Sequence, residues 1–157
     1  MIYRIKKLKG DTIPVPQLIF SKLGIAEEYN VRVALYVLAT GITDPDTVQQ
    51  LSGAFVEMSG DSCAVYSMNG TRLNSIQSGY ARPAIAAGKT RFVLYNRSGN
   101  ELRVESRTQN LYSKTLENSI YLCAMSDTGT LAVATDSADS TARLTVYTST
   151  MTEQLHW

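Results

Sequence analysis

Histidine and cysteine are nearly absent from this sequence, and their scarcity limits the chemistry that it can perform. The single histidine, His156, is the penultimate residue, and Cys63 and Cys123 are separated by 123 − 63 = 60 positions. A Ser-His-Asp triad and a structural zinc site both need such side chains gathered in one place. We therefore predict no metal and no cofactor. Both cysteines lie in apolar runs, and we interpret them as buried free thiols.

Signatures of other catalytic classes are missing as well. No G-x-x-x-x-G-K-[ST] loop and no G-x-G-x-x-G fingerprint occurs. Glu101 and Glu105 share one face of a predicted strand, but four residues of strand separate them by about 13–14 Å, too far for a glycosidase pair. Asp136 and Asp139 lie in a loop without the further oxygen ligands of a calcium site, which indicates a solvated turn. We predict that the chain is not an enzyme.

The sequence also lacks a long apolar run and a strong net charge. A membrane-spanning helix needs about 20 apolar residues, and no run approaches that length. Asp11 and two prolines stand where a signal peptide would be apolar. The net charge of +1 creates no global field toward nucleic acid or an anionic membrane. We predict a cytoplasmic location for the chain as written.

The first third of the sequence has helical patterns. Residues 15–24 and 27–40 carry apolar side chains at helical spacing, although the β-branched residues of the second run leave a strand as its alternative. Residues 44–52 open with an Asp-Pro pair, which suits the start of a helix. These patterns predict a helical N-terminal unit over residues 1–52.

From Gly53 onward, short runs rich in Val, Tyr, Leu and Thr alternate with turn residues such as Asn69-Gly70. This alternation predicts antiparallel strands joined by hairpins. The side chains that we expect in strands, mostly buried, are Tyr66, Val93, Tyr95, Leu131, Val133 and Val146. The predicted fold class is therefore α+β, with a short helical unit followed by an antiparallel all-β domain over residues 53–157.

The β region repeats itself. Residues 83–116 align with residues 121–155 at an offset near 39, since 132 − 93 = 39 and 125 − 86 = 39, and residues 63–76 match the latter half of such a unit. Four strands in about forty residues are what one β-propeller blade needs. The region holds 157 − 53 + 1 = 105 residues, or about two and a half blades, whereas a closed propeller needs about 4–8.

An open stack of blades leaves sheet edges bare, and bare edges favour association. We therefore expect a protein partner or self-association through open sheet edges. The alternatives are a fragment of a larger propeller and a small β-sandwich.

The segments VYSMNG, GYARPAI, VLYNRSGNELRVESRT and AMSDTGTLAVAT, within residues 60–150, resemble an uncharacterised family of bacterial propeller-like proteins with quinoprotein-type repeats. The resemblance implies a β-propeller scaffold without a known enzymatic activity. Members of that family usually carry a membrane anchor and place the propeller outside the cell. An enzyme with a quinone-type cofactor, by analogy with other propellers, finds no supporting residue here.

The N-terminal segments DTIPVPQLIFSKLG, YNVRVALYVLATG and TDPDTVQQL resemble the start of DnaD-like winged-helix proteins of bacterial replication initiation, over residues 2–51. In that family a recognition helix would follow, but strand and turn patterns follow here. The two resemblances meet at Leu51–Gly53 without a linker. A fusion, a hybrid reading frame and a fragment are the alternatives.

These observations lead to two functional hypotheses. The first is a non-enzymatic scaffold or protein-interaction module. The alternative is nucleic-acid binding in a replication-related role through four basic side chains near the N-terminus, which would contact phosphates in a salt-dependent way. These side chains are Arg4, Lys6, Lys7 and Lys9.

Overall fold

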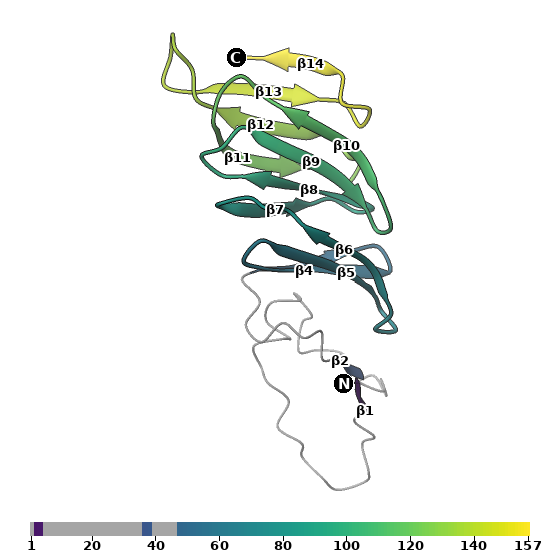
Figure 1. The fold of residues 1–157 in the computed structure, drawn as a ribbon. Helices are drawn as coiled ribbons and strands as arrows, with labels where there is room; N and C mark the ends of the chain where they lie inside the picture. The colour runs from purple at the N-terminus through teal and green to yellow at the C-terminus, as the bar shows by residue number, and fades with distance from the viewer. Residues whose placement is uncertain (1, 5–35, 39–46) are drawn as a thin grey trace, which may run out of the picture.

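The computed structural model describes residues 2–4, 36–38 and 47–157, and every helix or strand assigned within these ranges is a β-strand. A small antiparallel sheet pairs β1 (Ile2–Arg4) with β2 (Tyr36–Leu38). The other strands form three four-stranded sheets, stacked one after another along the molecule (Figure 1).

Each of the three sheets is built from four consecutive strands. The first contains β3 (Thr47–Leu51), β4 (Ala54–Ser59), β5 (Ser62–Ser67) and β6 (Arg72–Gln77). The second contains β7 (Pro83–Ala87), β8 (Arg91–Asn96), β9 (Glu101–Ser106) and β10 (Asn110–Thr115). The third contains β11 (Ile120–Met125), β12 (Leu131–Thr135), β13 (Arg143–Tyr147) and β14 (Glu153–His156). Neighbours in sequence are antiparallel neighbours in the sheet, so each sheet is a meander.

The helix predicted over residues 44–52 is wrong where the structure describes it. Thr47–Leu51 is a strand that pairs with Ala54–Ser59, and Leu51 stands opposite Ala54. The two residues between them include Gly53, whose φ of +69° suits a tight hairpin turn. Pairing across this turn outweighs the helix-start signal at the Asp-Pro pair, because local propensity yields to tertiary contacts.

The helix predicted over residues 27–40 is also contradicted at Tyr36–Leu38, which is a strand with Ile2–Arg4 as its partner. The strand alternative for this run holds there. The helix predicted over residues 15–24 lies outside the described residues, as does most of the DnaD-like resemblance. The division of the chain into domains at residue 52 stays a prediction, although the first sheet begins at Thr47 and not after Gly53.

The all-β region therefore contains three complete four-stranded sheets and not two and a half. The first sheet is completed by one further strand, β3, which the sequence pattern assigned to a helix. The repeat itself is confirmed: Val93 and Ala132, aligned at an offset of 132 − 93 = 39, both lie in the second strand of their sheets. Successive four-stranded meanders of this kind are propeller-like.

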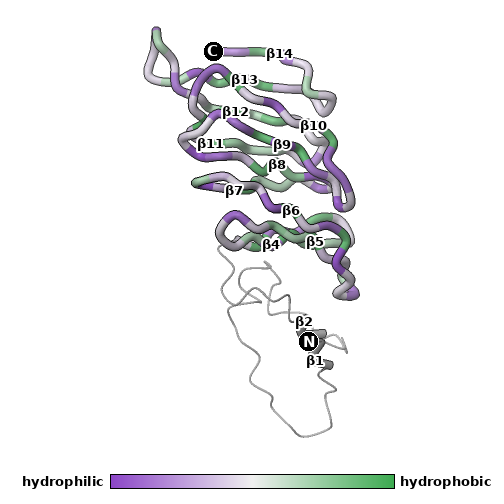
Figure 2. The backbone as a smooth tube through the Cα atoms, viewed as in Figure 1, coloured by the Kyte–Doolittle hydropathy of each residue, from purple (hydrophilic) through white to green (hydrophobic). Residues whose placement is uncertain are grey.

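The first and second sheets enclose one hydrophobic core. It is formed by side chains of β3, β4, β5 and β6 on one side and by Phe92 and Leu94 of β8 on the other. The second and third sheets enclose another core, in which Val93 and Val104 pack with Leu131 and Val133. Figure 2 shows hydrophobic segments running through the strands of all three sheets. The burial of apolar area between the sheets is the main stabilising contribution to this stack.

Backbone contacts also join the sheets. Ser52 N donates a hydrogen bond to Lys89 O at 2.6 Å, which links the first sheet to the second. Ile120 N donates to Gly99 O, and Ser98 N donates to Ile120 O, which link the second sheet to the third. These bonds fix the position of each sheet on the next, beyond what apolar packing alone would specify.

The burial predicted from the sequence is confirmed for five of six side chains, with Val146 half-buried. Tyr66, Val93, Tyr95, Leu131 and Val133 are all buried strand residues. On β13 the buried positions are Thr145 and Tyr147, whose side chains lie on the opposite face from Val146.

Candidate functional site

The outer face of the third sheet, turned away from the second, is apolar across all four strands. The register places Leu122 opposite Ala134, Ala124 opposite Ala132, Leu144 opposite Ala134, Val146 opposite Ala132, and Leu155 opposite Val146. Directly opposed residues of a sheet share a face. These seven side chains therefore form one continuous surface, called here the outer apolar face: Leu122, Ala124, Ala132, Ala134, Leu144, Val146 and Leu155.

The outer apolar face is accessible. Leu122 is 51% exposed and Leu155 is 43% exposed, at two ends of the row, and the residues between them are half-buried or exposed. On the other face of β12, by contrast, Leu131 and Val133 are buried against the second sheet. A large apolar surface that remains exposed on a soluble protein commonly marks an interaction site.

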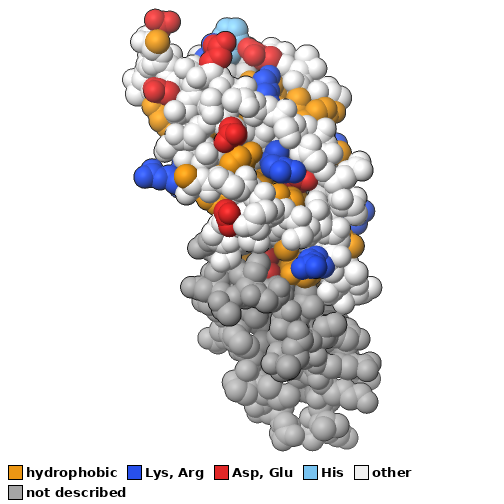
Figure 3. All heavy atoms as spheres, in the orientation of Figure 1, with side chains coloured by type: hydrophobic (Ala, Val, Ile, Leu, Met, Phe, Trp, Pro, Cys, Tyr) orange, Lys and Arg blue, Asp and Glu red, His pale blue; other side chains and the backbone are white. Residues whose placement is uncertain are grey.

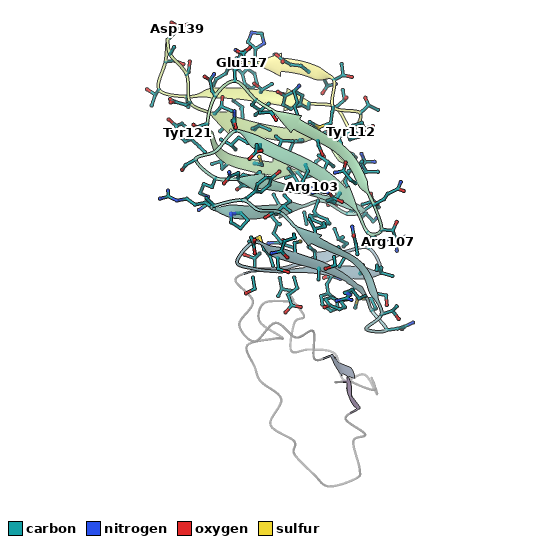
Figure 4. The ribbon with its side chains drawn as sticks, viewed as in Figure 1. Arg103, Arg107, Tyr112, Glu117, Tyr121 and Asp139 are labelled. Atoms are coloured by element: carbon teal, nitrogen blue, oxygen red, sulfur yellow. The ribbon has the colours of Figure 1, made fainter. Side chains whose placement is uncertain are left out.

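Acidic side chains border this surface. Asp127 lies in the turn between β11 and β12, and Asp136 and Asp139 lie in the loop between β12 and β13. The hydroxyl of Tyr121 donates a hydrogen bond to Asp136 Oδ1 at 3.0 Å, and this bond raises the pKa of Tyr121. Figure 4 shows Asp139 at the tip of its loop, and Figure 3 shows acidic side chains at the upper end of the molecule, over the third sheet.

A buried ionic cluster lies on the second sheet. Glu105 is fully buried on β9, and its Oε1 accepts hydrogen bonds from Arg103 Nε and from Asn110 Nδ2, the latter at 2.8 Å. The carboxylate faces the first sheet, since it shares a face with Phe92. Glu101, predicted with Glu105 on one face, is exposed at the start of the strand. We interpret the cluster as structural, because burying a polar group costs free energy unless it is hydrogen-bonded.

The two cysteines are buried, as the sequence predicts. Burial raises the pKa of the Cys63 thiol to about 12, with a further rise from the negative charge of Glu105. Burial alone raises the pKa of Cys123 to about 12. Both side chains are therefore neutral thiols at physiological pH, and neither has the properties of a nucleophile.

The other residues named from the sequence are placed as follows. His156 Nδ1 lies 2.9 Å from Glu153 Oε1 on exposed β14. Within the described ranges, no three His, Cys, Asp or Glu side chains are grouped so that they could hold a metal ion. Arg4 lies in β1. Lys6, Lys7 and Lys9 fall outside the described residues, so the nucleic-acid contact stays a prediction.

The outer apolar face was not anticipated from the sequence, although a signal for it exists. The runs LAVAT and RLTVY of β12 and β13 place apolar residues on both faces, as strands covered on both sides do. Only the stack order shows that, among the described sheets, the third packs against a neighbour on one side.

The chain was compared with known proteins. Residues 28–156 match the model of a family described as "Family of unknown function (DUF5711)". No curated protein matches the chain. Among solved structures, the chain is similar to the Neurospora crassa Pan2 WD40 domain, with a TM-score of 0.49 and 12% sequence identity. That alignment covers 72% of this chain and 35% of the other, so this chain spans about a third of the solved structure's length.

Proposed function

Since the chain belongs to DUF5711, a family of unknown function, we propose a role from the geometry of its sheets: it is a protein-interaction module whose outer apolar face binds a β-sheet of a partner protein. The expectation of an uncharacterised propeller-like family is met by the family match and by the three meander sheets. The observation that carries the proposal is the uncovered outer apolar face, Leu122 to Leu155.

The two interfaces within the chain support a β-sheet as the partner. In each, one sheet covers the apolar face of the next, with aliphatic side chains from both sides. A partner sheet packed on the outer apolar face would extend this stack by one sheet. Its small central residues, Ala124, Ala132 and Ala134, would let a further sheet approach to the roughly 10 Å that separates packed sheets.

A second copy of this chain fits the outer apolar face less well. Two such faces packed together would bring the acidic borders at Asp127, Asp136 and Asp139 toward one another, and like charges oppose association. In a head-to-tail stack the complement would be the face of the first sheet turned away from the second, but Glu57, Ala64 and Tyr66 on that face are buried. The proposed partner therefore carries an apolar sheet face with basic groups at its border.

Three expectations from the sequence remain proposals. The part of the chain that the structure describes contains no helix long and apolar enough to cross a membrane. The cytoplasmic location and the absence of enzymatic activity stay predictions. Nucleic-acid binding through Arg4, Lys6, Lys7 and Lys9 stays the alternative function.

Photo-crosslinking tests the interaction. A benzoylphenylalanine placed at Ala134 samples the outer apolar face, and one at exposed Ser113 of β10 is the matched control on a sheet edge. In cells that produce the protein, we expect a discrete adduct from position 134 and none from position 113. Mass spectrometry then identifies the crosslinked partner segment, which should lie in a β-strand of the partner.

Three outcomes would overturn the proposal. No adduct from position 134 would show that the face is unoccupied. An adduct with twice the 17.2 kDa chain mass would identify a second copy as the occupant. Equal adducts from positions 134 and 113 would show that the contact is nonspecific. Circular dichroism of both variants verifies that the sheets have formed.

A further inference from the structure

The turns at one end of the first and second sheets carry basic side chains and no acidic ones. These turns comprise residues 51–54, 67–72, 87–91 and 106–110, and their charged members are Arg72, Lys89, Arg91 and Arg107. The turns at the opposite end of the same sheets carry both signs of charge, for example Asp61 and Arg97. The basic end therefore has a local positive potential, which the net charge of the whole chain does not reveal.

Two of these basic residues meet at the Ser52 turn. Ser52 O accepts a hydrogen bond from Arg107 Nη1 at 3.2 Å, and Ser52 N donates to Lys89 O at 2.6 Å. The guanidinium of Arg107 lies against Gly53, where a Cβ would stand 3.4 Å from Nη1. That separation is an ordinary van der Waals contact, so glycine is favoured at position 53 by its φ of +69°. Figure 4 shows Arg107 at the turn between β9 and β10.

A cleft of about 530 Å³ opens beside Arg107. Its walls include Leu73 and Leu111 and the hydroxyl-bearing residues Ser67, Thr90 and Thr108. Among the described residues that line it, none is Asp or Glu. The volume falls within the range of about 300–1,000 Å³ that is typical of small-ligand sites. The cleft therefore combines an aliphatic wall with a single exposed guanidinium.

The charges around the cleft leave Arg107 available to an anion. Arg91 also lines the cleft, but its Nη1 donates to Ser149 O of the third sheet at 2.7 Å. Glu105, close in sequence to Arg107, is already bonded to Arg103 and Asn110. Arg107 uses one bond to Ser52 O, and a guanidinium carries five N–H donors in a planar fork.

A planar guanidinium fork matches a carboxylate, which accepts two parallel hydrogen bonds. Leu73 and Leu111 would accept an aliphatic group attached to that carboxylate. We propose that this cleft binds a carboxylate joined to a short branched aliphatic group. Two sources carry this chemistry: a free short-chain carboxylic acid, and a peptide that ends in a leucine with a free C-terminus.

Isothermal titration calorimetry of the full chain with defined compounds tests the site. The probes are 4-methylpentanoate, acetyl-Gly-Gly-Leu, and the same peptide with a C-terminal amide. We expect at least one of the two carboxylates to bind and the amide to bind at least about tenfold more weakly, because a charged hydrogen bond is lost. Tighter binding of the free acid assigns the ligand to small molecules, and tighter binding of the peptide assigns it to C-termini.

Variants locate the binding in the cleft. Arg107→Gln should weaken binding of the carboxylate probes by about tenfold or more. Arg97 is exposed at the opposite end of the second sheet, so Arg97→Gln should leave the affinity unchanged. Leu73→Ala should weaken binding of 4-methylpentanoate more than binding of acetate, which has no long aliphatic group. Absence of binding by both carboxylates, equal binding of the amide, or equal effects of the two arginine variants would overturn the proposal.

Discussion

Phe92 and Val93 are consecutive residues of β8, and both are fully buried because their side chains face different neighbouring sheets. Phe92 belongs to the core with the first sheet, and Val93 belongs to the core with the third. On β12, at the same place in the third sheet, Val133 is buried whereas its neighbour Ala134 is only half-buried. The central strand β8 of the second sheet is thus covered on both faces, whereas the third sheet has one covered face and the outer apolar face.

The enclosed position of β8 predicts a large effect of Leu94→Ala on stability. Leu94 is fully buried in the core between the first and second sheets, so truncation removes apolar contact and leaves a cavity. We expect the free energy of unfolding to fall by about 2–5 kcal/mol in urea denaturation. Leu155→Ala, on the outer apolar face, is the control and should change it by no more than about 0.5 kcal/mol. Equal losses would show that the outer apolar face is covered within the chain.

Substitution of the two glutamates of β9, Glu105 and Glu101, should change the free energy of unfolding by different amounts. Glu105 is buried and bonded to Arg103 and Asn110, so Glu105→Ala removes the acceptor of the Arg103 guanidinium, whereas the Asn110 amide keeps its bonds to Val104 O and Tyr112 O. Because the Arg103 side chain is partly exposed and can reach water, we expect a loss of about 1–3 kcal/mol in the free energy of unfolding. Glu101→Ala, at the exposed start of the same strand, should stay within about 0.5 kcal/mol. A neutral Glu105→Ala would contradict a structural role for the cluster.

The sequence predicts the β region well because strands and turns leave local signals. Short β-branched runs between turn residues predict the strands of the second and third sheets, and the offset of 39 residues predicts the repeat. The helix predicted at Thr47–Leu51 fails for a physical reason. A short polar strand such as TVQQL has little periodicity of its own, and its pairing with Ala54–Ser59 decides its structure.

The candidate sites are harder to predict than the strands. The outer apolar face consists of ordinary strand residues, and only the stacking order distinguishes Ala134 from Val133. The cleft beside Arg107 depends on turns that are 55 positions apart, joined by the bond from Arg107 to Ser52. Neither arrangement has a local sequence pattern, because both arise from how the sheets pack.

The packing of the third sheet on the second should depend on Gly88. A Cβ at this position would overlap the backbone carbonyl of Ser126 in the turn between β11 and β12. Backbone atoms move less readily than a side-chain tip, so Gly88→Ala should force the two sheets apart and reduce the free energy of unfolding by about 1–3 kcal/mol. Lys89→Ala, next in the same exposed turn, is the control. A Gly88→Ala variant as stable as the control would contradict this contact.

The buried thiols predict how stability varies at alkaline pH. In the unfolded chain the cysteines have their ordinary pKa of 9.0, whereas in the folded protein burial raises the pKa values of Cys63 and Cys123 to about 12. Below pH 9 both states hold the protons, so the thiols contribute no pH dependence. Between pH 9 and about 12 the unfolded state loses protons that the folded state retains, and the free energy of unfolding therefore falls as the pH rises.

Urea denaturation at pH 8, 9.5 and 10.5 measures this fall, and the Cys63→Ala/Cys123→Ala double variant is the control. All other ionisable groups are common to both proteins, so the difference between the two slopes reports the thiols. We expect the wild type to lose stability more steeply than the double variant. Thiol reagent at pH 8 should label neither cysteine until urea is added, because a buried, protonated thiol is unreactive. Rapid labelling of the folded protein, or equal slopes for the two proteins, would contradict the buried placement of these side chains.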